Sequence, residues 1–246
     1  VKSVLGWLWK EDVGPIGRWA GWQTPLQKFN CHICPSWHPS YLQRSERRGG
    51  NEVLEALFRQ HLFDACTLRG RPWDKVPDYA QEVQCLFDSL DAARAVHRMV
   101  TNGRMVAVDF ETTTLKPDGP DARIYSCSIS DGETTISYPW CGKAVGATGV
   151  LLRSAVVKVA SNAGFEERWT WKEFGHGVRN WVHDTMLAAH VLDNRPGITG
   201  LKFQSFVLLG QGPYDDHIKP YLVGEGGNGR NRIKELDLHQ LLLYGG

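Results

Sequence analysis

The stretch Val106–Leu115, with the sequence VAVDFETTTL, decides the fold that we expect for most of this chain. A mostly apolar run from Arg104 to Phe110 is typical of a buried central strand. Residues i and i+2 of an extended segment project to the same face, so Asp109 and Glu111 direct two carboxylates to one point. Paired carboxylates suit Mg²⁺ or Mn²⁺. On its own, a D-x-E pair is more often a solvated acidic turn.

Strands and helices are expected on both sides of this segment. Short strands are predicted at 82–86, 124–129, 134–138 and 156–160, and helices at 92–99, 165–174, 184–191 and 201–209. Asp131-Gly132 is a turn signal, so three strands in succession suggest a meander. Ser89 or Asp91 is expected to cap one helix, and Gly175 to end another.

The composition indicates a folded chain of one or two domains and excludes disordered and collagen-like classes. The 246 residues include 28 Lys and Arg against 27 Asp and Glu, and 42% are hydrophobic. No stretch reaches the ~18–20 apolar residues needed to cross a bilayer, and no cleavable leader is recognisable, so we expect an intracellular, cytoplasmic protein without a membrane partner. Six irregularly spaced cysteines indicate reduced thiols.

The N-terminal quarter has a different pattern. An amphipathic helix is predicted over 51–66, with Asn51 as its cap after Gly49-Gly50. The polar, turn-rich segment 67–81 follows and is interpreted as a linker. The chain therefore divides into a domain at 1–66, a linker at 67–81 and a second domain at 82–246.

Three further segments add to the D-x-E pair. They are Ser161–Trp169 (SNAGFEERW), His183–Ala189 (HDTMLAA) and Leu241–Gly246 (LLLYGG). In this order the segments resemble the 3′–5′ exonuclease domain of family A DNA polymerases, within the DEDD nuclease superfamily and its subgroup with a tyrosine in the last motif. The resemblance covers about residues 82–246. It implies an α/β, ribonuclease H-like fold, with a mixed sheet and flanking helices.

The resemblance also implies roles for single residues. Asp109, Glu111 and Glu166 would hold two Mg²⁺ or Mn²⁺ ions, and the Tyr244 hydroxyl would orient the attacking water. Glu166 stands where many members have Asp, which lengthens the reach to the metal. We prefer Glu166 to Glu167 because a helix turns the next residue roughly 100° away.

The last motif, Y-x-x-x-D, begins at Tyr244, and its aspartate would lie beyond Gly246. We therefore expect three acidic ligands and a chain that is inactive or weakly active as given.

Other positions are expected to contact the substrate or to support the site. By resemblance, Thr112 and Leu115 would contact the 3′-terminal nucleotide, together with Asn162 and Phe165. The side-chain amide of Asn162 would act mainly by fixing the conformation of its own loop. Asp184 is interpreted as a helix cap rather than as a metal ligand.

The segment Cys34–Arg44 (CPSWHPSYLQR) resembles the DNA-inserting loop near the C-terminus of uracil-DNA glycosylases of the family 4 and 5 type. The resemblance implies a partial α/β domain. In that family's terms, His38 would bond the flipped base, Pro39 and Ser40 would press into the strand, and Arg44 would meet a phosphate. Because the half that forms the uracil pocket is not matched, we expect no uracil excision.

These observations predict a metal-dependent 3′–5′ exonuclease acting on single-stranded or frayed DNA 3′ ends. We expect it to be a fragment of a replication or repair protein from a phage or bacterium, linked covalently to a polymerase domain. Three alternatives stay open. They are a ribonuclease D-like RNA-processing enzyme, a binding module that has lost catalysis, and a uracil-DNA glycosylase whose catalytic half is missing here.

Overall fold

The computed structural model describes residues 2–9, 12–46, 52–72, 75–76, 78–212, 214–224 and 229–246. They form two compact units, one of Val1–Pro77 with Ala189–Tyr214 and the other of Asp78–Ala188 with Asp215–Gly246. The division differs from the predicted one in one respect. Residues 189–214, which we expected to belong with the exonuclease-like part, pack with the N-terminal segment.

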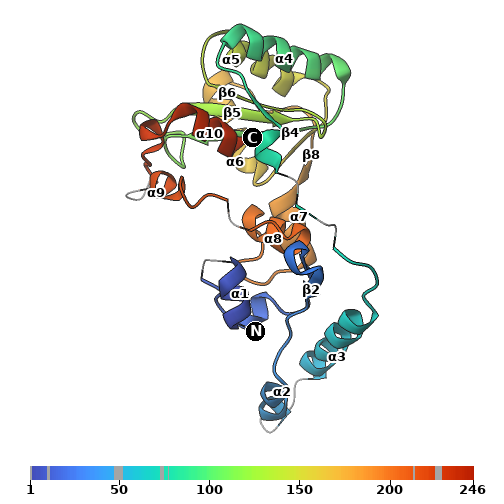
Figure 1. Cartoon of the computed structure of the whole chain (residues 1–246). Coiled ribbons are helices and arrows are strands. Elements are labelled where there is room, and N and C mark those ends of the chain that lie inside the picture. Colours follow the sequence, from blue (N-terminus) through green and yellow to red (C-terminus); the bar gives the residue numbers. More distant parts are fainter. Residues whose placement is uncertain are drawn as a thin grey trace. The chain divides into compact units, whose positions relative to one another are not determined.

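A six-stranded sheet organises the larger unit (Figure 1). Its strands are β3 (Val83–Cys85), β4 (Val106–Thr112), β5 (Ile124–Ser130), β6 (Thr135–Pro139), β7 (Lys158–Ala160) and β8 (Trp181–Asp184), in the order β3-β6-β5-β4-β7-β8. The strands β4, β5 and β6 pair antiparallel as the predicted meander, whereas β3, β7 and β8 pair parallel to their neighbours. The predicted α/β class with a mixed sheet and flanking helices is confirmed.

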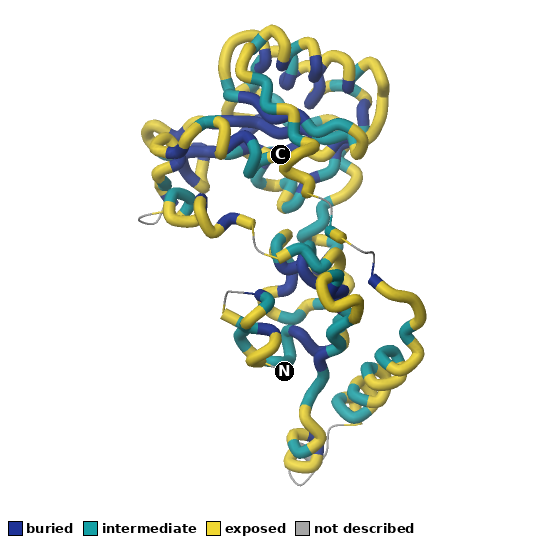
Figure 2. Tube along the Cα trace, in the orientation of Figure 1, coloured by how far each residue is buried: buried dark blue, intermediate teal, exposed yellow. Residues whose placement is uncertain are grey.

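Helices cover both faces of this sheet. They are α4 (Ser89–Asn102), α5 (Gly142–Arg153), α6 (Ala163–Phe174), α9 (Lys219–Leu222) and α10 (Leu238–Gly245), with α7 (Thr185–Leu192) leading out of the unit. The apolar sides of α4 and α5 pack on Val106, Val108 and Phe110 of β4. The opposite face carries α10 (Figure 1), and Figure 2 shows the buried trace concentrated in the strands.

Two details of the larger unit differ from the sequence predictions. Helix α5 was not predicted, because three glycines and the absence of a capping side chain give its segment no helical signal. Helix α4 is capped by Asp88, whose carboxylate accepts from the backbone N–H groups of Leu90 and Asp91, rather than by Ser89 or Asp91 themselves. Asp88 has the extended backbone that a cap requires.

The smaller unit is built around aromatic side chains. Its elements are α1 (Lys2–Trp9), β1 (Thr24–Leu26), β2 (Cys31–Ile33), α2 (Pro39–Glu46), α3 (Glu52–Thr67) and α8 (Leu201–Leu209), and its core contains Trp9, Trp19, Phe203 and Phe206. Helix α3 lies where it was predicted, although none of its described side chains is buried. The predicted Asn51 cap lies outside the described residues. None of the described helices is long and apolar enough to span a bilayer.

Candidate active site

Strand β4 presents two carboxylates on the face of the sheet that α10 covers. Val106, Val108 and Phe110 are buried in the core on the other face, so Asp109 and Glu111 share the face with α10. Asp109 reaches solvent, and Glu111 is half-buried. The strand is therefore central, as predicted, but only one of its faces is buried in the apolar core.

The third predicted ligand, Glu166, lies in the first turn of α6 and is only 2% exposed. Burial and the nearby negative charge of Asp109 raise the pKa of Glu166 to about 9. Hydrogen bonds from the backbone N–H groups of Glu166 and Phe110 lower this pKa only in part. Desolvation of its carboxylate raises the pKa of Asp109 as well, although part of the residue reaches solvent. The structure thus brings Asp109 and Glu166 together.

The chemistry of this pair fits a divalent cation. Among the described residues, Oε2 of Glu166 has no hydrogen-bond partner although it is buried. A buried, unpartnered oxygen beside a second carboxylate is unfavourable without a cation or a proton. No three His, Cys, Asp or Glu side chains within the described ranges lie close enough together to hold an ion. Asp109 and Glu166 therefore form the core of the candidate site, and Glu111 does not complete a cluster of three among the described residues.

The neighbouring glutamate, Glu167, is hydrogen-bonded to groups of the protein. Oε2 of Glu167 accepts from the backbone N–H of Val178 at 2.9 Å and from the indole N–H of Trp181 at 3.0 Å. Oε1 accepts from the indole N–H of Trp171 at 3.0 Å. The Glu167 carboxylate thus already accepts three hydrogen bonds from the protein, whereas the ligand role predicted for Glu166 stays a prediction.

Asp184 is a helix cap, as predicted. Its Oδ1 accepts from the backbone N–H groups of Met186 and Leu187 at the start of α7. The same carboxylate also accepts from Asn162 at 3.0 Å and Ala163 at 2.8 Å, at the start of α6. Burial alone would raise the pKa of Asp184, but these four N–H groups lower it overall. Asp184 therefore ties together the beginnings of two helices.

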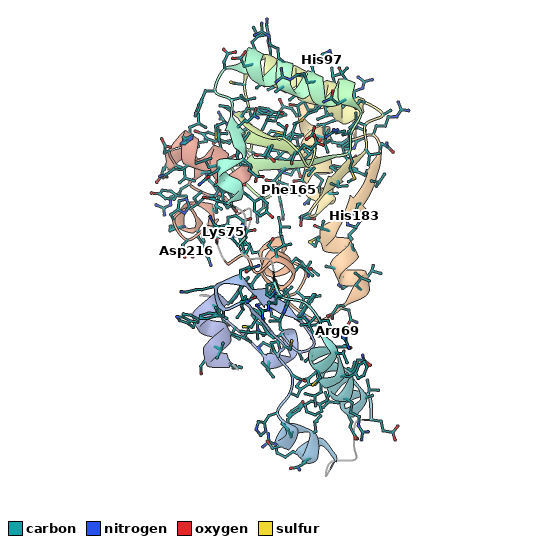
Figure 3. All side chains as sticks on the ribbon, turned by 45° about the vertical axis from the view of Figure 1, so that its right-hand side comes forward. Arg69, Lys75, His97, Phe165, His183 and Asp216 are labelled. Atoms are coloured by element: carbon teal, nitrogen blue, oxygen red, sulfur yellow. The ribbon has the colours of Figure 1, made fainter. Side chains whose placement is uncertain are left out.

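The backbone conformation of Asn162 favours an asparagine at this position. It precedes α6 with a φ of 68°, a left-handed conformation that Asn tolerates better than most residues, and its side chain caps nothing in α6. Phe165 is half-buried in the first turn of the same helix. Figure 3 labels Phe165, and this side chain packs against the apolar core cluster to which α4 and α5 also contribute. Contact of either residue with a nucleotide stays a prediction.

The two predicted substrate residues after β4 differ in exposure. Thr112 is buried, and its hydroxyl donates to the carbonyl of Thr114 at 2.7 Å. Leu115 is 63% exposed. The Thr112 hydroxyl therefore supports the loop, whereas the Leu115 side chain is accessible to a ligand.

Helix α10, which carries Tyr244, lies on the carboxylate face of the sheet. A Cβ atom on the next residue, Gly245, would lie 2.9 Å from Oγ of Ser128 and 3.6 Å from Cγ of Glu111. A residue with a Cβ atom at position 245 would therefore require the Ser128 side chain or the helix to shift. Tyr244 itself is half-buried and packs on the apolar cluster of Ile218, Ile233, Leu236 and Leu241.

The sequence analysis missed the serines that face the carboxylates. Ser128 and Ser126 of β5 pair directly with Asp109 and Glu111 of β4. The Ser126 hydroxyl is buried and has no hydrogen-bond partner among the described residues. The signal was available, because β5 carries a serine at every second position from 126 to 130, which places a row of hydroxyls on one face.

The predicted glycosylase-like loop contains a helix in this structure. Helix α2 begins at Pro39, and Nδ1 of His38 lies 2.7 Å from Oγ of Ser40 and accepts from its backbone N–H. His38 thus stabilises the start of a helix. Arg44 is exposed in the same helix.

Comparisons with known proteins bear on the larger unit. Residues 85–206 match the sequence model of the family described as "3'-5' exonuclease". A search of curated proteins found no match. The comparisons give no support to the uracil-DNA-glycosylase resemblance.

Several solved structures are similar to this chain at low identity. RNase D of Escherichia coli is 15% identical, with a TM-score of 0.49 over 65% of this chain and 39% of that one. The catalytic core of RRP6 from Trypanosoma brucei is 18% identical, with a TM-score of 0.46 over 66% and 41%. NrnC of Brucella melitensis with bound Mg²⁺ is 19% identical, with a TM-score of 0.42 over 66% and 70%.

The chain thus spans about two fifths of the length of the first two of these proteins. The family match includes Asp109, Glu111 and Glu166, and it ends within α8. Residues 85–206 of this chain are accordingly similar to a 3′–5′ exonuclease domain.

Proposed function

We propose that this domain hydrolyses phosphodiester bonds at nucleic-acid 3′ ends and that it requires divalent cations. The observation that carries the proposal is the buried Glu166 carboxylate, with one unpartnered oxygen, beside Asp109 in a domain of the exonuclease family. Two like charges at this position repel each other, and a cation relieves the repulsion. The two carboxylates are therefore expected to favour the binding of a divalent metal ion between them.

Asp109 and Glu166 would hold the cation, and Glu111 on the same face would add a third carboxylate when a second ion binds. Mg²⁺ or Mn²⁺ bound there would supply positive charge to the attacking and leaving oxygens of the phosphodiester. Tyr244, on the helix that covers this face, would orient a water molecule through its hydroxyl group. An unperturbed phenol has a pKa of ~10 and keeps its proton at neutral pH, so this role is one of orientation.

The terminal nucleotide would pack against the exposed side chain of Leu115 and against Phe165, with Asn162 and Thr112 supporting their loops. We take the substrate to be the 3′ end of single-stranded or frayed DNA, and the domain to work beside a covalently linked polymerase. The carboxylates do not distinguish deoxyribose from ribose. RNA as the substrate is therefore one of the outcomes of the test below.

The test measures metal binding and strand trimming in the same chain. We expect the chain to bind Mn²⁺ in calorimetric titrations, and D109N or E166Q to weaken binding by about tenfold or more because each removes a charged ligand. E173Q is the matched control, because Glu173 is an exposed glutamate of the same helix. Release of 5′-mononucleotides from labelled DNA and RNA 3′ ends is then compared for each variant.

The proposal predicts that trimming by the wild-type chain, which we expect to be weak, requires Mn²⁺ and is lost in D109N. Faster digestion of RNA than of DNA would keep the exonuclease assignment and replace the substrate. A wild-type chain that binds no Mn²⁺, or trimming that survives D109N, would refute it.

A further inference from the structure

A small basic cavity lies beside the loop that follows the two carboxylates of β4. Its volume is about 220 Å³. Its lining includes Thr113, Asn231 and the charged side chains of Asp121, Arg230, Arg232, Lys234 and Glu235. Ligand pockets for complete small molecules usually measure ~300–1,000 Å³, so this cavity suits one chemical group rather than an entire cofactor.

The cavity is joined to the candidate active site by backbone hydrogen bonds. The Asn231 side chain donates to the carbonyl of Thr112 at 2.8 Å, and its backbone N–H donates to the carbonyl of Thr113 at 3.2 Å. The hydroxyl of Thr113 is bonded within the loop, to Asp121 and Arg123. Segment 230–235 is therefore held directly against the residues that follow Glu111.

Thr113 is two residues beyond Glu111, which corresponds to roughly 7 Å of extended chain. A nucleic-acid strand whose end reached the carboxylates would cover this distance with one or two nucleotides. The cavity is thus within reach of a neighbouring part of the same strand.

The charges on the cavity wall favour an anion. Arg232 is positioned by a hydrogen bond to the carbonyl of Pro220 and by the ring of Tyr221, and it lies 3.6 Å from Glu235. Arg230 lies 3.8 Å from Asp121, and both side chains are more than half exposed. Exposed pairs of this kind contribute little, so a phosphate can compete with the carboxylates for the arginines.

Lys234 adds a positive charge to the cavity wall that no nearby carboxylate of the described residues neutralises. It is exposed, and no carboxylate among the described residues lies within ion-pair distance of it. Three cations therefore face the cavity against two carboxylates, each of which lies near an arginine. A single negative group would balance the remaining charge.

We infer that this cavity binds a backbone phosphate of the substrate strand, one or two nucleotides from the phosphodiester that is cleaved, through Arg230 and Lys234. The inference rests on the proposed function, because it assumes that the strand end lies at Asp109 and Glu166. It assigns a positioning role to these cations, which contact the strand but not the reacting atoms.

The test uses a fluorescent single-stranded oligonucleotide, dT12, with the full chain in EDTA, so that binding is measured without cleavage. We expect K234A and R230A each to weaken binding about three- to tenfold. The slope of log K against log salt concentration should become shallower by ~0.7 for each lost phosphate contact. R98A is the matched control, because Arg98 is an exposed arginine on α4, which covers the other face of the sheet.

The outcomes separate this inference from the proposed function. Weaker dT12 binding in K234A and R230A, with Mn²⁺ binding unchanged, supports the cavity as a phosphate site. In trimming assays the same variants should raise KM and leave kcat nearly unchanged. If the wild-type chain binds Mn²⁺ and trims, but K234A and R230A match R98A in affinity and salt slope, the inference is wrong and the nuclease stands. If the two variants lose dT12 binding while no chain binds Mn²⁺, the cavity is supported as a phosphate site and the nuclease is refuted.

Discussion

Glu166 and Glu167 are adjacent glutamates with opposite environments. Glu167 accepts hydrogen bonds from Val178, Trp171 and Trp181, so its charge is well solvated by the protein. Glu166 is buried beside Asp109 and keeps one oxygen without a partner in the described part of the chain. One step along a helix separates a hydrogen-bonded carboxylate from one that is buried beside a second acid.

The raised pKa of Glu166 makes a prediction about stability without metal. Its pKa is 4.5 in an ordinary environment and about 9 in the folded chain, so the folded state holds a proton that the unfolded state releases. The contribution to stability is complete below pH 4.5 and is lost as the pH rises toward 9. Urea unfolding in EDTA should therefore show a free energy of unfolding that falls across this range.

E166Q removes the titrating group and serves as the comparison. At pH 8 in EDTA it should be more stable than the wild type by roughly 1–3 kcal/mol, and at pH 4 the two should be similar. Addition of Mn²⁺ at pH 8 should stabilise the wild type but not E166Q. Equal pH dependence of the two chains in EDTA would contradict the assigned environment of Glu166.

At the scale of the elements, Asp184 connects the end of β8 with the starts of α6 and α7. It accepts four backbone N–H groups, from Asn162, Ala163, Met186 and Leu187. Because α6 carries Glu166, this aspartate helps to hold a candidate metal ligand in position without touching a metal. Its sequence signature is that of an ordinary helix cap, and the contact with α6 comes from the fold.

D184A should destabilise the chain by about 2–3 kcal/mol in urea, since a cap alone contributes ~1 kcal/mol and two further N–H groups lose their acceptor. D88A removes the cap of α4, which accepts only two N–H groups, and should cost about 1 kcal/mol. The pKa of Asp184 is lowered, so its contribution should persist above pH 3.8 and be lost only at lower pH. Equal losses for D184A and D88A would argue against the link between α6 and α7.

At the scale of the whole molecule, the chain leaves the sheet-containing unit through α7 and returns to it after Tyr214. In between, α8 packs on the N-terminal segment. The ring centroids of Trp19 and Phe203 are 5.0 Å apart, and those of Trp19 and Phe206 are 5.8 Å apart. Arg195 reinforces the unit by donating to the carbonyls of Gly17 and Ala20. The N-terminal segment is therefore part of the folding environment of α8.

This packing predicts that W19A, which empties a fully buried site, destabilises the smaller unit by about 3–5 kcal/mol. Hydrogen exchange followed by mass spectrometry should show faster exchange in α8 (Leu201–Leu209), with little change in α4 (Ser89–Asn102). W171A is the control, because Trp171 is 56% exposed. An equal increase in α4 would mean that the two units do not open separately.

The sequence by itself determined the elements whose signals are local. The apolar run before Asp109, the turn at Asp131-Gly132 and the cap at Asp184 each act on neighbouring residues, and each is found in the structure. The i, i+2 spacing also predicted that Asp109 and Glu111 share a face, because side chains alternate along a strand. The pitch of a helix likewise predicted that Glu166 and Glu167 point in different directions, and the family resemblance selected Glu166 as the candidate ligand.

Only the tertiary structure decided which distant residues meet. The serines of β5 face the carboxylates because of strand register, and Asn231 reaches the loop after β4 from more than 100 residues away. Helix α5 buries several of its residues and has no capping side chain. Helix α8 packs on Trp19, which is far from it in the sequence. These contacts depend on the burial of surfaces far apart in the chain, and no local pattern of residues encodes which surfaces will pair.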